Sequence, residues 1–355
     1  MLGRLFLVLI VALVLAPGTW LRSEVTRGFK EPVTLTKINE PGAPLPPGWS
    51  LEGVWQYQGE GRAFGGFSAL LALNGQTLRA FTDRSAQLTL VMPDKPQSPY
   101  RVGKALRPAR QLKRQPTEKA PAGWLYDLES ATRDPDTGQY WLGYEIFHTI
   151  QRFDKASRPD GMRDLMDEVD WSDNSGAEAL VRLSDGRFVL IPESGRKVMV
   201  FPKDPVEGAE AVLLDYVSPQ SGFGITDAAQ LPDGRLLLLL RRVVWDLPSF
   251  EVRIAVAEMP KDGEAQELRP QFVLNLTAVA PRDNYEGLAV AAQADGMVDL
   301  WIISDDNFSV FQRTLLVKLR LDPAMLRPLD TPTGDAGDAG DAGDAGDRAK
   351  QKARE

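Results

Sequence analysis

The sequence predicts an all-β protein built as a β-propeller, on two observations: a repeated pair of strands and a repeated tight turn between them. Five segments share a pattern that runs from a small or acidic residue through a short apolar strand and a turn to a second strand ending in a charge. The segments read GFSALLALNGQTLRAFTDR from Gly66, DLESATRDPDTGQYWLGYE from Asp127, GAEALVRLSDGRFVLIPES from Gly176, ITDAAQLPDGRLLLLLRR from Ile225 and NYEGLAVAAQADGMVDLWIISDD from Asn284.

The turns inside these segments have the composition of tight hairpins. Asn-Gly, Asp-Gly and Asp-x-Gly sequences supply the positive φ angles that such turns require. They occur at Asn74-Gly75, Asp136-Thr137-Gly138, Asp185-Gly186, Asp233-Gly234 and Asp295-Gly296. The flanking runs are β-branched, aromatic or leucine-rich, as a half-buried sheet favours.

Further strand-like runs follow each hairpin, so each unit holds about four strands in roughly 50 to 60 residues, which is typical of a propeller blade. The last unit has only the run from Gln312 after its hairpin, and the N-terminal runs VTLTKI from Val33 and GVWQYQ from Gly53 can complete it. Such closure removes an exposed sheet edge. We therefore expect five four-stranded blades closed by N- and C-terminal strands, within a domain spanning residues 30–326. A sixth blade built from the N-terminal strands is one alternative, and a β-sandwich with accidental repeats is another.

The two ends of the chain are expected to lie outside this domain. Arg4 precedes an apolar run from Leu5 to Ala16, which is shorter than a membrane span and resembles a secretory signal within residues 1–23. This predicts a periplasmic or secreted protein, and an uncleaved N-terminal membrane anchor is the alternative. Residues 331–355 contain a Gly-Asp-Ala repeat that cannot bury surface, so they predict a disordered acidic tail.

Composition excludes several classes of function. The net charge of −8 argues against a nucleic-acid binder, which needs a basic surface. The chain has no cysteine and one histidine, His148, so iron–sulfur clusters and zinc–thiolate sites are excluded, and no haem, NAD or FAD is expected. The acidic balance fits metal ions or small ligands better.

Carboxylates recur at one position of the repeat. Aligning the five segments makes Ser68, Glu129, Glu178, Asp227 and Glu286 equivalent. The first strand of each propeller blade lines the central channel, so these side chains are expected to converge on the axis. The second strands are expected to form a wider polar ring, whose members are Asp83, Glu145, Glu193, Arg241 or Arg242, and Asp305 with Asp306.

Gathered carboxylates repel one another and raise their own pKa values unless a cation intervenes. Oxygen ligands without histidine or cysteine favour calcium or magnesium. Glu129, Glu178, Asp227 and Glu286 are therefore candidate calcium ligands and candidate general acids or bases. The alternative is that these acids bond backbone amides between blades.

Arginines close to these acids are candidate binders of a small anionic substrate. Arg241, Arg242 and Arg313 can each grip a phosphate or carboxylate with two hydrogen bonds, and Asp305 and Asp306 are candidate substrate contacts beside them. A purely structural pairing of Arg313 with Asp305 or Asp306 is the alternative. The stretch Asp173-Asn174-Ser175-Gly176 is also rich in oxygen ligands, although its residues are ordinary turn formers.

Other catalytic motifs are missing from the sequence. There is no Gly-x-Ser-x-Gly elbow, and the glycines from Gly59 to Gly66 lack the Lys-Ser/Thr of a phosphate loop. His148 is expected to be structural, although any Ser-His-Asp triad would have to use it.

Three blocks of the sequence resemble a known family. NYEGLAV from Asn284 with WIISDDNFSVFQRTLLVKLRLD from Trp301, GGFSAL from Gly65 with FTDRS from Phe81, and ITDAAQLPDGRLLLLLRR from Ile225 are similar to the bacterial phytase-like domain family, described as having esterase-like activity of phytase. The similarity extends from about Gly53 to Asp322, and SDDNF…QRT is its most specific part.

This resemblance implies an exported propeller that hydrolyses phosphoesters or esters. Since the chain lacks the histidines and cysteine of other phosphatase classes, such chemistry would need metal and carboxylates. A non-catalytic propeller that binds a ligand or protein in the cell envelope is the alternative. A lactonase-type or quinone-linked sugar-oxidising propeller is a third reading.

Overall fold

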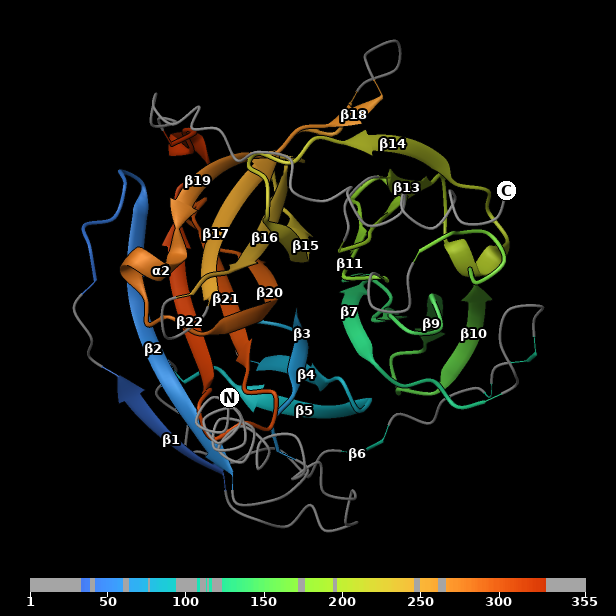
Figure 1. Cartoon of the computed structure of the whole chain (residues 1–355), viewed down its shortest axis with the longest axis horizontal. Helices are drawn as coiled ribbons and strands as arrows, with labels where there is room; N and C mark the ends of the chain where they lie inside the picture. The colour runs from blue at the N-terminus through green and yellow to red at the C-terminus, as the bar shows by residue number, and fades with distance from the viewer. Residues whose placement is uncertain are drawn as a thin grey trace, which may run out of the picture.

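The five predicted blades are present and enclose a central axis (Figure 1). The computed structural model describes residues 33–38, 42–59, 64–75, 77–93, 107–108, 113, 115–116, 123–171, 176–193, 197–245, 250–260 and 266–329. The predicted signal (1–23), the acidic tail (331–355) and the turn residues 173–175 lie outside these residues. None of the described helices is long and apolar enough to cross a membrane.

Blades 1 and 2 are four-stranded antiparallel sheets that begin at the axis. Blade 1 consists of β3 (Phe67–Ala72), β4 (Thr77–Thr82), β5 (Ala86–Val91) and β6 (Arg107–Pro108). Blade 2 consists of β7 (Leu128–Arg133), β8 (Tyr140–Tyr144), β9 (Thr149–Phe153) and β10 (Pro159–Asp164).

One short strand from the chain segment of blade 4 joins the sheet of blade 3. Blade 3 consists of β11 (Ala179–Arg182), β12 (Phe188–Ile191), β13 (Lys197–Phe201), β14 (Val212–Tyr216) and the parallel strand β18 (Glu267–Leu268). Blade 4 consists of β15 (Gly224–Gln230), β16 (Leu236–Val243), β17 (Phe250–Ala257) and β19 (Gln271–Asn275). The chain leaves β17, covers the edge of blade 3 as β18 and returns as β19, which protects the otherwise open edge of β14.

Blade 5 joins the two ends of the domain, as predicted. It consists of β20 (Asn284–Ala292), β21 (Val298–Asp305), β22 (Thr314–Leu321), β2 (Trp49–Gly59) and β1 (Val33–Ile38). Strand β2 pairs with β22 from Trp49↔Leu321 to Tyr57↔Thr314. Within the described residues, the short helices η1 (Pro205–Glu207) and α2 (Leu276–Val279) lie in connections between strands, and η2 (Pro323–Met325) follows β22.

The predicted turn chemistry holds at four of the hairpins. Gly138, Gly186, Gly234 and Gly296 have φ angles between 75° and 92°, a region that glycine enters without steric cost. Each turn therefore reverses the chain within a few residues, so that the second strand ends beside the start of the inner strand.

The core lies between the blades. Each of the five clusters of buried apolar side chains spans two neighbouring sheets. For example, Phe81 of blade 1 meets Tyr140 of blade 2, and Trp141 of blade 2 meets Phe188 of blade 3 at 4.8 Å between ring centroids. Because every sheet is buried on both faces, its inner strands read as nearly continuous apolar runs.

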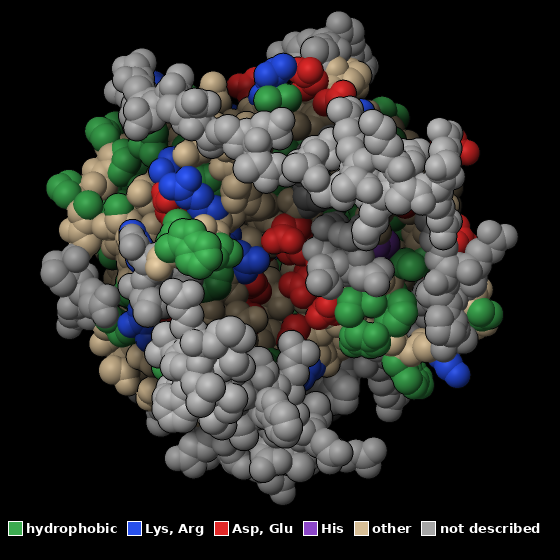
Figure 2. All heavy atoms as spheres, viewed as in Figure 1, with side chains coloured by type: hydrophobic (Ala, Val, Ile, Leu, Met, Phe, Trp, Pro, Cys, Tyr) green, Lys and Arg blue, Asp and Glu red, His purple; other side chains and the backbone are tan. Residues whose placement is uncertain are grey.

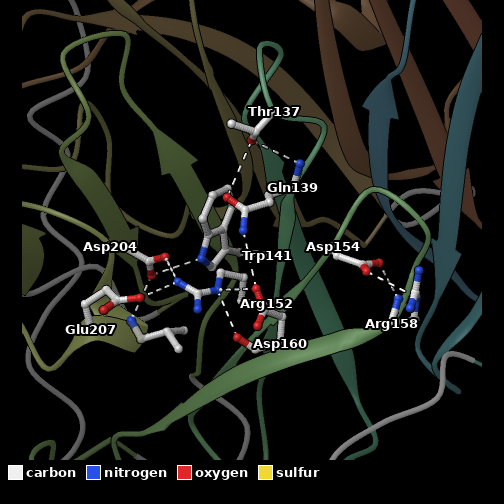
Figure 3. A network of polar contacts seen from close by, with 10 residues as sticks. Thr137, Gln139, Trp141, Arg152, Asp154, Arg158, Asp160, Asp204 and Glu207 are labelled. Atoms are coloured by element: carbon white, nitrogen blue, oxygen red, sulfur yellow. Dashed lines mark hydrogen bonds and ion pairs between the residues drawn. The ribbon is translucent and has the colours of Figure 1, made fainter.

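A polar network also ties blade 2 to blade 3 (Figure 3). Nη1 of Arg152 lies 2.7 Å from Oδ2 of Asp204, the N-cap residue of η1, and 2.6 Å from Oε1 of Glu207, the last residue of η1. Nε1 of Trp141 donates to the other oxygen of Asp204 at 3.0 Å. The side chains of Arg152 and Asp204 are each only 16% exposed, so this pair is largely removed from water.

Replacing Arg152 is expected to destabilise the protein. Arg152→Ala leaves Asp204 without its charged partner, and the loss of hydrogen bonds to a charged group predicts a decrease of about 1.5–3 kcal/mol in the free energy of unfolding. Arg158→Ala is the matched control, because Arg158 pairs with Asp154 at the surface and is 74% exposed, so it should change stability by less than about 0.5 kcal/mol. Urea unfolding measures both, and equal changes would contradict the assigned role of Arg152.

Candidate functional site

The inner strands begin at the same end of the channel. A buried apolar residue (Phe67, Leu128, Ala177, Ile225 or Tyr285) is followed in each blade by the residue that the axis brings together. In four blades the inner strand departs from regular pairing at that residue, between Phe67 and Ala69, Leu128 and Ser130, Ile225 and Asp227, and Tyr285 and Gly287. Such bulges re-aim a side chain. The re-aimed residues are Ser68, Glu129, Thr226 and Glu286.

The repeat in blade 4 is therefore displaced by one residue from the predicted alignment. Thr226, not Asp227, is the equivalent of Glu129 and Glu286. Oδ2 of Asp227 accepts from the Leu288 amide of blade 5 at 2.6 Å, and Oδ1 accepts from Ala228 at 2.8 Å. Asp227 thus bonds backbone amides between blades, which was the alternative considered for these acids, and it does not join the carboxylates at the axis.

The remaining acids converge as predicted. Glu129 of blade 2, Glu178 of blade 3 and Glu286 of blade 5 lie near one another. The charges of Glu178 and Glu286 help to raise the pKa of Glu129, and the charge of Glu286 helps to raise the pKa of Glu178. The ends of the second strands add a further layer, which contains Asp83, Glu145, Glu193, Arg241 and Asp305. We call this end of the channel the acidic mouth; Figure 2 shows acidic side chains gathered at the centre of the ring.

Two groups of carboxylates in the acidic mouth are close enough to share an ion. One contains Asp127, Glu129 and Glu145, and the other contains Glu145, Glu178 and Glu193. Within each group, one oxygen per residue lies within 4.8 Å of the others. Glu145 belongs to both groups, so it is the centre of the cluster.

Asp127 was not among the predicted site residues. It precedes the inner strand of blade 2 with φ of +63°, while Gly66 holds the same position in blade 1 with φ of +66°. The other blades have Gly176, Gly224 and Asn284 there. The sequence signal for Asp127 is an acidic residue at a position that holds glycine or asparagine in the other blades. A non-glycine residue with positive φ is uncommon.

Gly176 allows Glu145 to approach the neighbouring blade. A Cβ atom at Gly176 would lie 2.6 Å from Cα of Glu145. The amide of Gly176 donates to Oε1 of Glu145 at 3.3 Å. Glycine is therefore required at this contact between blades 2 and 3.

Burial and like charge shift the protonation of the cluster. Burial, followed by the charges of neighbouring carboxylates, holds the pKa values of Glu129 and Glu178 well above their usual range. Burial also raises the pKa of Glu145 to about 7 and that of Asp83 to about 6. Near neutral pH the acidic mouth must therefore retain protons or hold a cation.

Arg241 is the one predicted arginine that enters the acidic mouth. Its Nη1 donates to Oε1 of Glu286 and Oδ1 of Asn284, and its Nη2 lies 3.4 Å from Oε1 of Glu193. Asn284 also donates to Oε1 of Glu286 at 2.7 Å. Arg241 is thus held by groups from blades 3 and 5.

The other two predicted arginines pair elsewhere. Arg242 lies on the opposite face of β16, where its Nε donates to Glu251 at 2.7 Å and its guanidinium covers the ring of Phe223. Arg313 forms an ion pair with Asp283, with Nε 3.0 Å from Oδ2. The structural pairing with Asp305 or Asp306 that the sequence also suggested is not among the ion pairs of the described residues.

Asp305 and Asp306 serve different purposes. Asp305 faces the acidic mouth, where burial and the charge of Glu286 hold its pKa well above the usual range. Asp306 accepts from the amides of Gly66 and Phe308 and from Oγ1 of Thr314 at 2.9–3.1 Å. Asp306 therefore locks the loop after β21 onto blade 1.

His148, which we expect to be structural, ends the turn before β9. It is buried with φ of +40°, its ring packs edge-on against Trp171, and its carbonyl accepts from Leu165.

Two substitutions separate structural from functional acids. Asp227→Ala leaves the buried amide of Leu288 without an acceptor, so the free energy of unfolding should fall by about 1–3 kcal/mol. Glu129→Gln removes one repelling charge and should leave the stability of the metal-free protein at pH 8 unchanged or raised. Denaturant titrations at that pH test both, and a larger loss with Glu129→Gln than with Asp227→Ala would reverse the assignment.

The solved structures that match the chain have low sequence identity to it. Agrobacterium tumefaciens regucalcin, described as a calcium-binding protein, matches with a TM-score of 0.39 and 10% identity over 79% of this chain and 90% of its own. Streptogramin B lyase matches with a TM-score of 0.36 and 9% identity over 84% of this chain and 100% of its own. Kuenenia stuttgartiensis hydrazine synthase has a TM-score of 0.37 and 12% identity over 72% of this chain, which spans only 63% of that protein.

Sequence comparison identifies the family. No curated protein sequence matches the chain. Residues 62–308 match the phytase-like family, described as having esterase-like activity of phytase. This match covers four complete blades and the first two strands of blade 5, including every carboxylate of the acidic mouth. The chain therefore belongs to the phytase-like family of β-propeller proteins.

Proposed function

We propose that this protein is an exported, divalent-metal-dependent phosphoesterase or esterase whose chemistry takes place at the acidic mouth. The observation that supports this proposal is the pair of carboxylate groups that share Glu145. Family membership supports the reaction class.

The carboxylate groups fit a calcium ion in size and chemistry. Calcium binds oxygen ligands at about 2.3–2.6 Å, so ligands on opposite sides of one ion lie about 5 Å apart. The oxygens of each group lie within 4.8 Å of one another. Asp127, Glu129, Glu145, Glu178 and Glu193 would hold the metal, while Glu286 is engaged by Arg241 and Asp227 by backbone amides.

A bound divalent cation would supply charge neutralisation for a phosphoryl oxygen and a lowered pKa for a coordinated water. Asp83 is suited to accept a proton beside it, since its pKa is raised to about 6 and its buried Oδ1 has no hydrogen-bond partner among the described residues. A carboxylate whose pKa lies near the working pH is an effective general base. Arg241 holds Glu286 and Glu193 in place and limits repulsion within the acidic mouth.

We also propose that the substrate is a small anionic molecule of the periplasm or exterior. The N-terminal segment supports export, the net charge of −8 disfavours nucleic acid, and contact with a membrane would involve only the N-terminal segment. Fractionation of cells that express the full chain tests this location, and recovery of the protein in the cytoplasm with its N-terminus intact would contradict it.

Calcium binding and calcium-dependent turnover are the expected results. Titration calorimetry should detect stoichiometric binding, and p-nitrophenyl phosphate hydrolysis should stop on chelation. Glu145→Gln should weaken binding at least about tenfold, because Glu145 belongs to both ligand groups. Asp185→Asn is the control, since Asp185 lies in a hairpin turn and pairs with Arg187. If the protein neither binds calcium nor turns over substrate, a non-catalytic binding propeller becomes the better account.

The metal-free protein is expected to lose stability as the pH rises from about 5 to 8. The pKa of Glu145 is raised from 4.5 to about 7 and that of Asp83 from 3.8 to about 6. The folded state therefore binds more protons than the unfolded state in this window, so the free energy of unfolding falls as the pH increases.

Calcium should reverse this trend, because it binds the ionised carboxylates and not their protonated forms. Thermal unfolding at several pH values, with calcium and with chelator, measures the effect. The calcium-induced rise in Tm should increase with pH, and Glu145→Gln should flatten the metal-free profile. A metal-free Tm that climbs between pH 5 and 8 would contradict the buried-carboxylate account.

A further inference from the structure

The three arginines expected to bind substrate all form ion pairs with acidic side chains. Arg241 bonds Glu286 and Glu193, Arg242 bonds Glu251, and Arg313 bonds Asp283. An arginine that already faces a carboxylate has fewer free donors and less net charge to offer an anionic substrate. The anion must therefore be recognised by another group.

Arg84 is a guanidinium beside the acidic mouth that is not engaged in this way. It directly follows Asp83 at the end of the second strand of blade 1. Its guanidinium carbon lies 3.6 Å from the ring centroid of Phe308. Among the described parts of the chain, no carboxylate lies within ion-pair distance of Arg84 and no acceptor bonds its side chain.

Stacking on Phe308 determines which part of Arg84 remains available. The aromatic ring covers one face of the planar guanidinium, and none of the described residues bonds the N–H groups at its edge. Those N–H groups form the fork that binds phosphate or carboxylate with two parallel hydrogen bonds. Because the stack restricts the rotamers of Arg84, less conformational entropy is lost on binding.

The backbone at Asn307 and Phe308 adopts an energetically unfavourable conformation. Asn307 and Phe308 are consecutive residues with φ of +48° and +52°, a region that is unfavourable for an aromatic residue. Oδ1 of Asp305 accepts from Asn307 at 2.7 Å, and Oδ1 of Asp306 accepts from Phe308 at 3.0 Å. Two carboxylates therefore hold this loop in a strained conformation.

Blade 1 is shaped to receive that ring. A Cβ atom at Gly66 would lie 2.6 Å from Cε2 of Phe308 and 2.6 Å from Oδ1 of Asp83. The amide of Gly66 also donates to Asp306 at 3.1 Å. The glycine thus allows Phe308, Asp83 and the loop after β21 to meet at one point, directly beside Arg84.

We propose that Arg84, stacked on Phe308, binds the phosphoryl group of the substrate at the edge of the acidic mouth. This inference rests on the proposed function, because a bound cation must offset the carboxylates before an anion can approach. Asp83 and Arg84 then place a proton acceptor and an anion-binding fork on adjacent residues of one strand end.

Steady-state kinetics with calcium test this role. In Arg84→Gln, KM for p-nitrophenyl phosphate should rise about ten- to hundred-fold, the range expected for the loss of charge-assisted hydrogen bonds. KM for the uncharged ester p-nitrophenyl acetate should stay within about twofold, since no anion is bound there. Arg84→Lys should recover part of the loss, because it retains the charge without the planar fork. Arg187→Gln, in the hairpin turn of blade 3, is the matched control.

Binding of phenylphosphonate, measured by calorimetry with calcium and with chelator, separates the two proposals. If the wild-type protein turns over neither ester but binds phenylphosphonate, and Arg84→Gln does not, the proposed function fails and the anion site stands. If Arg84→Gln binds phenylphosphonate and hydrolyses the phosphate ester as the wild type does, Arg84 only braces Phe308 and the inference is overturned. Absence of phenylphosphonate binding to the wild-type protein under both conditions would also overturn it, and unchanged Tm values establish that the variants are folded.

Discussion

The pairing of β2 with β22 is the constraint on which the rest of the structure depends. It places strands from opposite ends of the domain in one sheet, from Trp49↔Leu321 to Tyr57↔Thr314. A closed ring has no free blade at either end, so the apolar faces of all five sheets are covered by neighbours. Closure also forces the starts of five inner strands toward one axis.

That convergence has an electrostatic consequence. Carboxyl groups that are far apart in sequence, such as Glu129 and Glu286, come near enough for the charge of Glu286 to add to the effect of burial in raising the pKa of Glu129. The apolar contacts between blades must outweigh this repulsion. A fold that maintains such repulsion without a bound cation sacrifices stability, which is common where residues are arranged for function.

Strand geometry explains why neighbouring residues have different roles. Successive side chains of a strand point to opposite faces, so Arg241 enters the acidic mouth while Arg242 meets Glu251 and Phe223. At the end of β21, Asp305 faces the carboxylates, while the next residue, Asp306, bonds the amides of Gly66 and Phe308. The same alternation and the bulge in β15 separate Thr226 from Asp227.

The sequence by itself determined the propeller, its five blades, its closing strands and the convergence of most acids, because turn chemistry and strand period recur in every unit. It could not place the bulge in β15, since Ile-Thr-Asp and Tyr-Glu-Gly align equally well with Thr226 or Asp227 opposite Glu286. It also could not identify the partners of the three arginines: those of Arg241 come from blades 3 and 5, while Arg242 and Arg313 pair with acids of their own blades, Glu251 and Asp283. Only the tertiary structure decided that Asp127 joins Glu129 and Glu145, and that Phe308 lies against Arg84 across the junction of blades 5 and 1. The stack of Arg84 on Phe308 joins residues distant in sequence, so its geometry is established only when the ring closes, whereas the position of Asp127 beside Glu145 depends on how β7 pairs with β8.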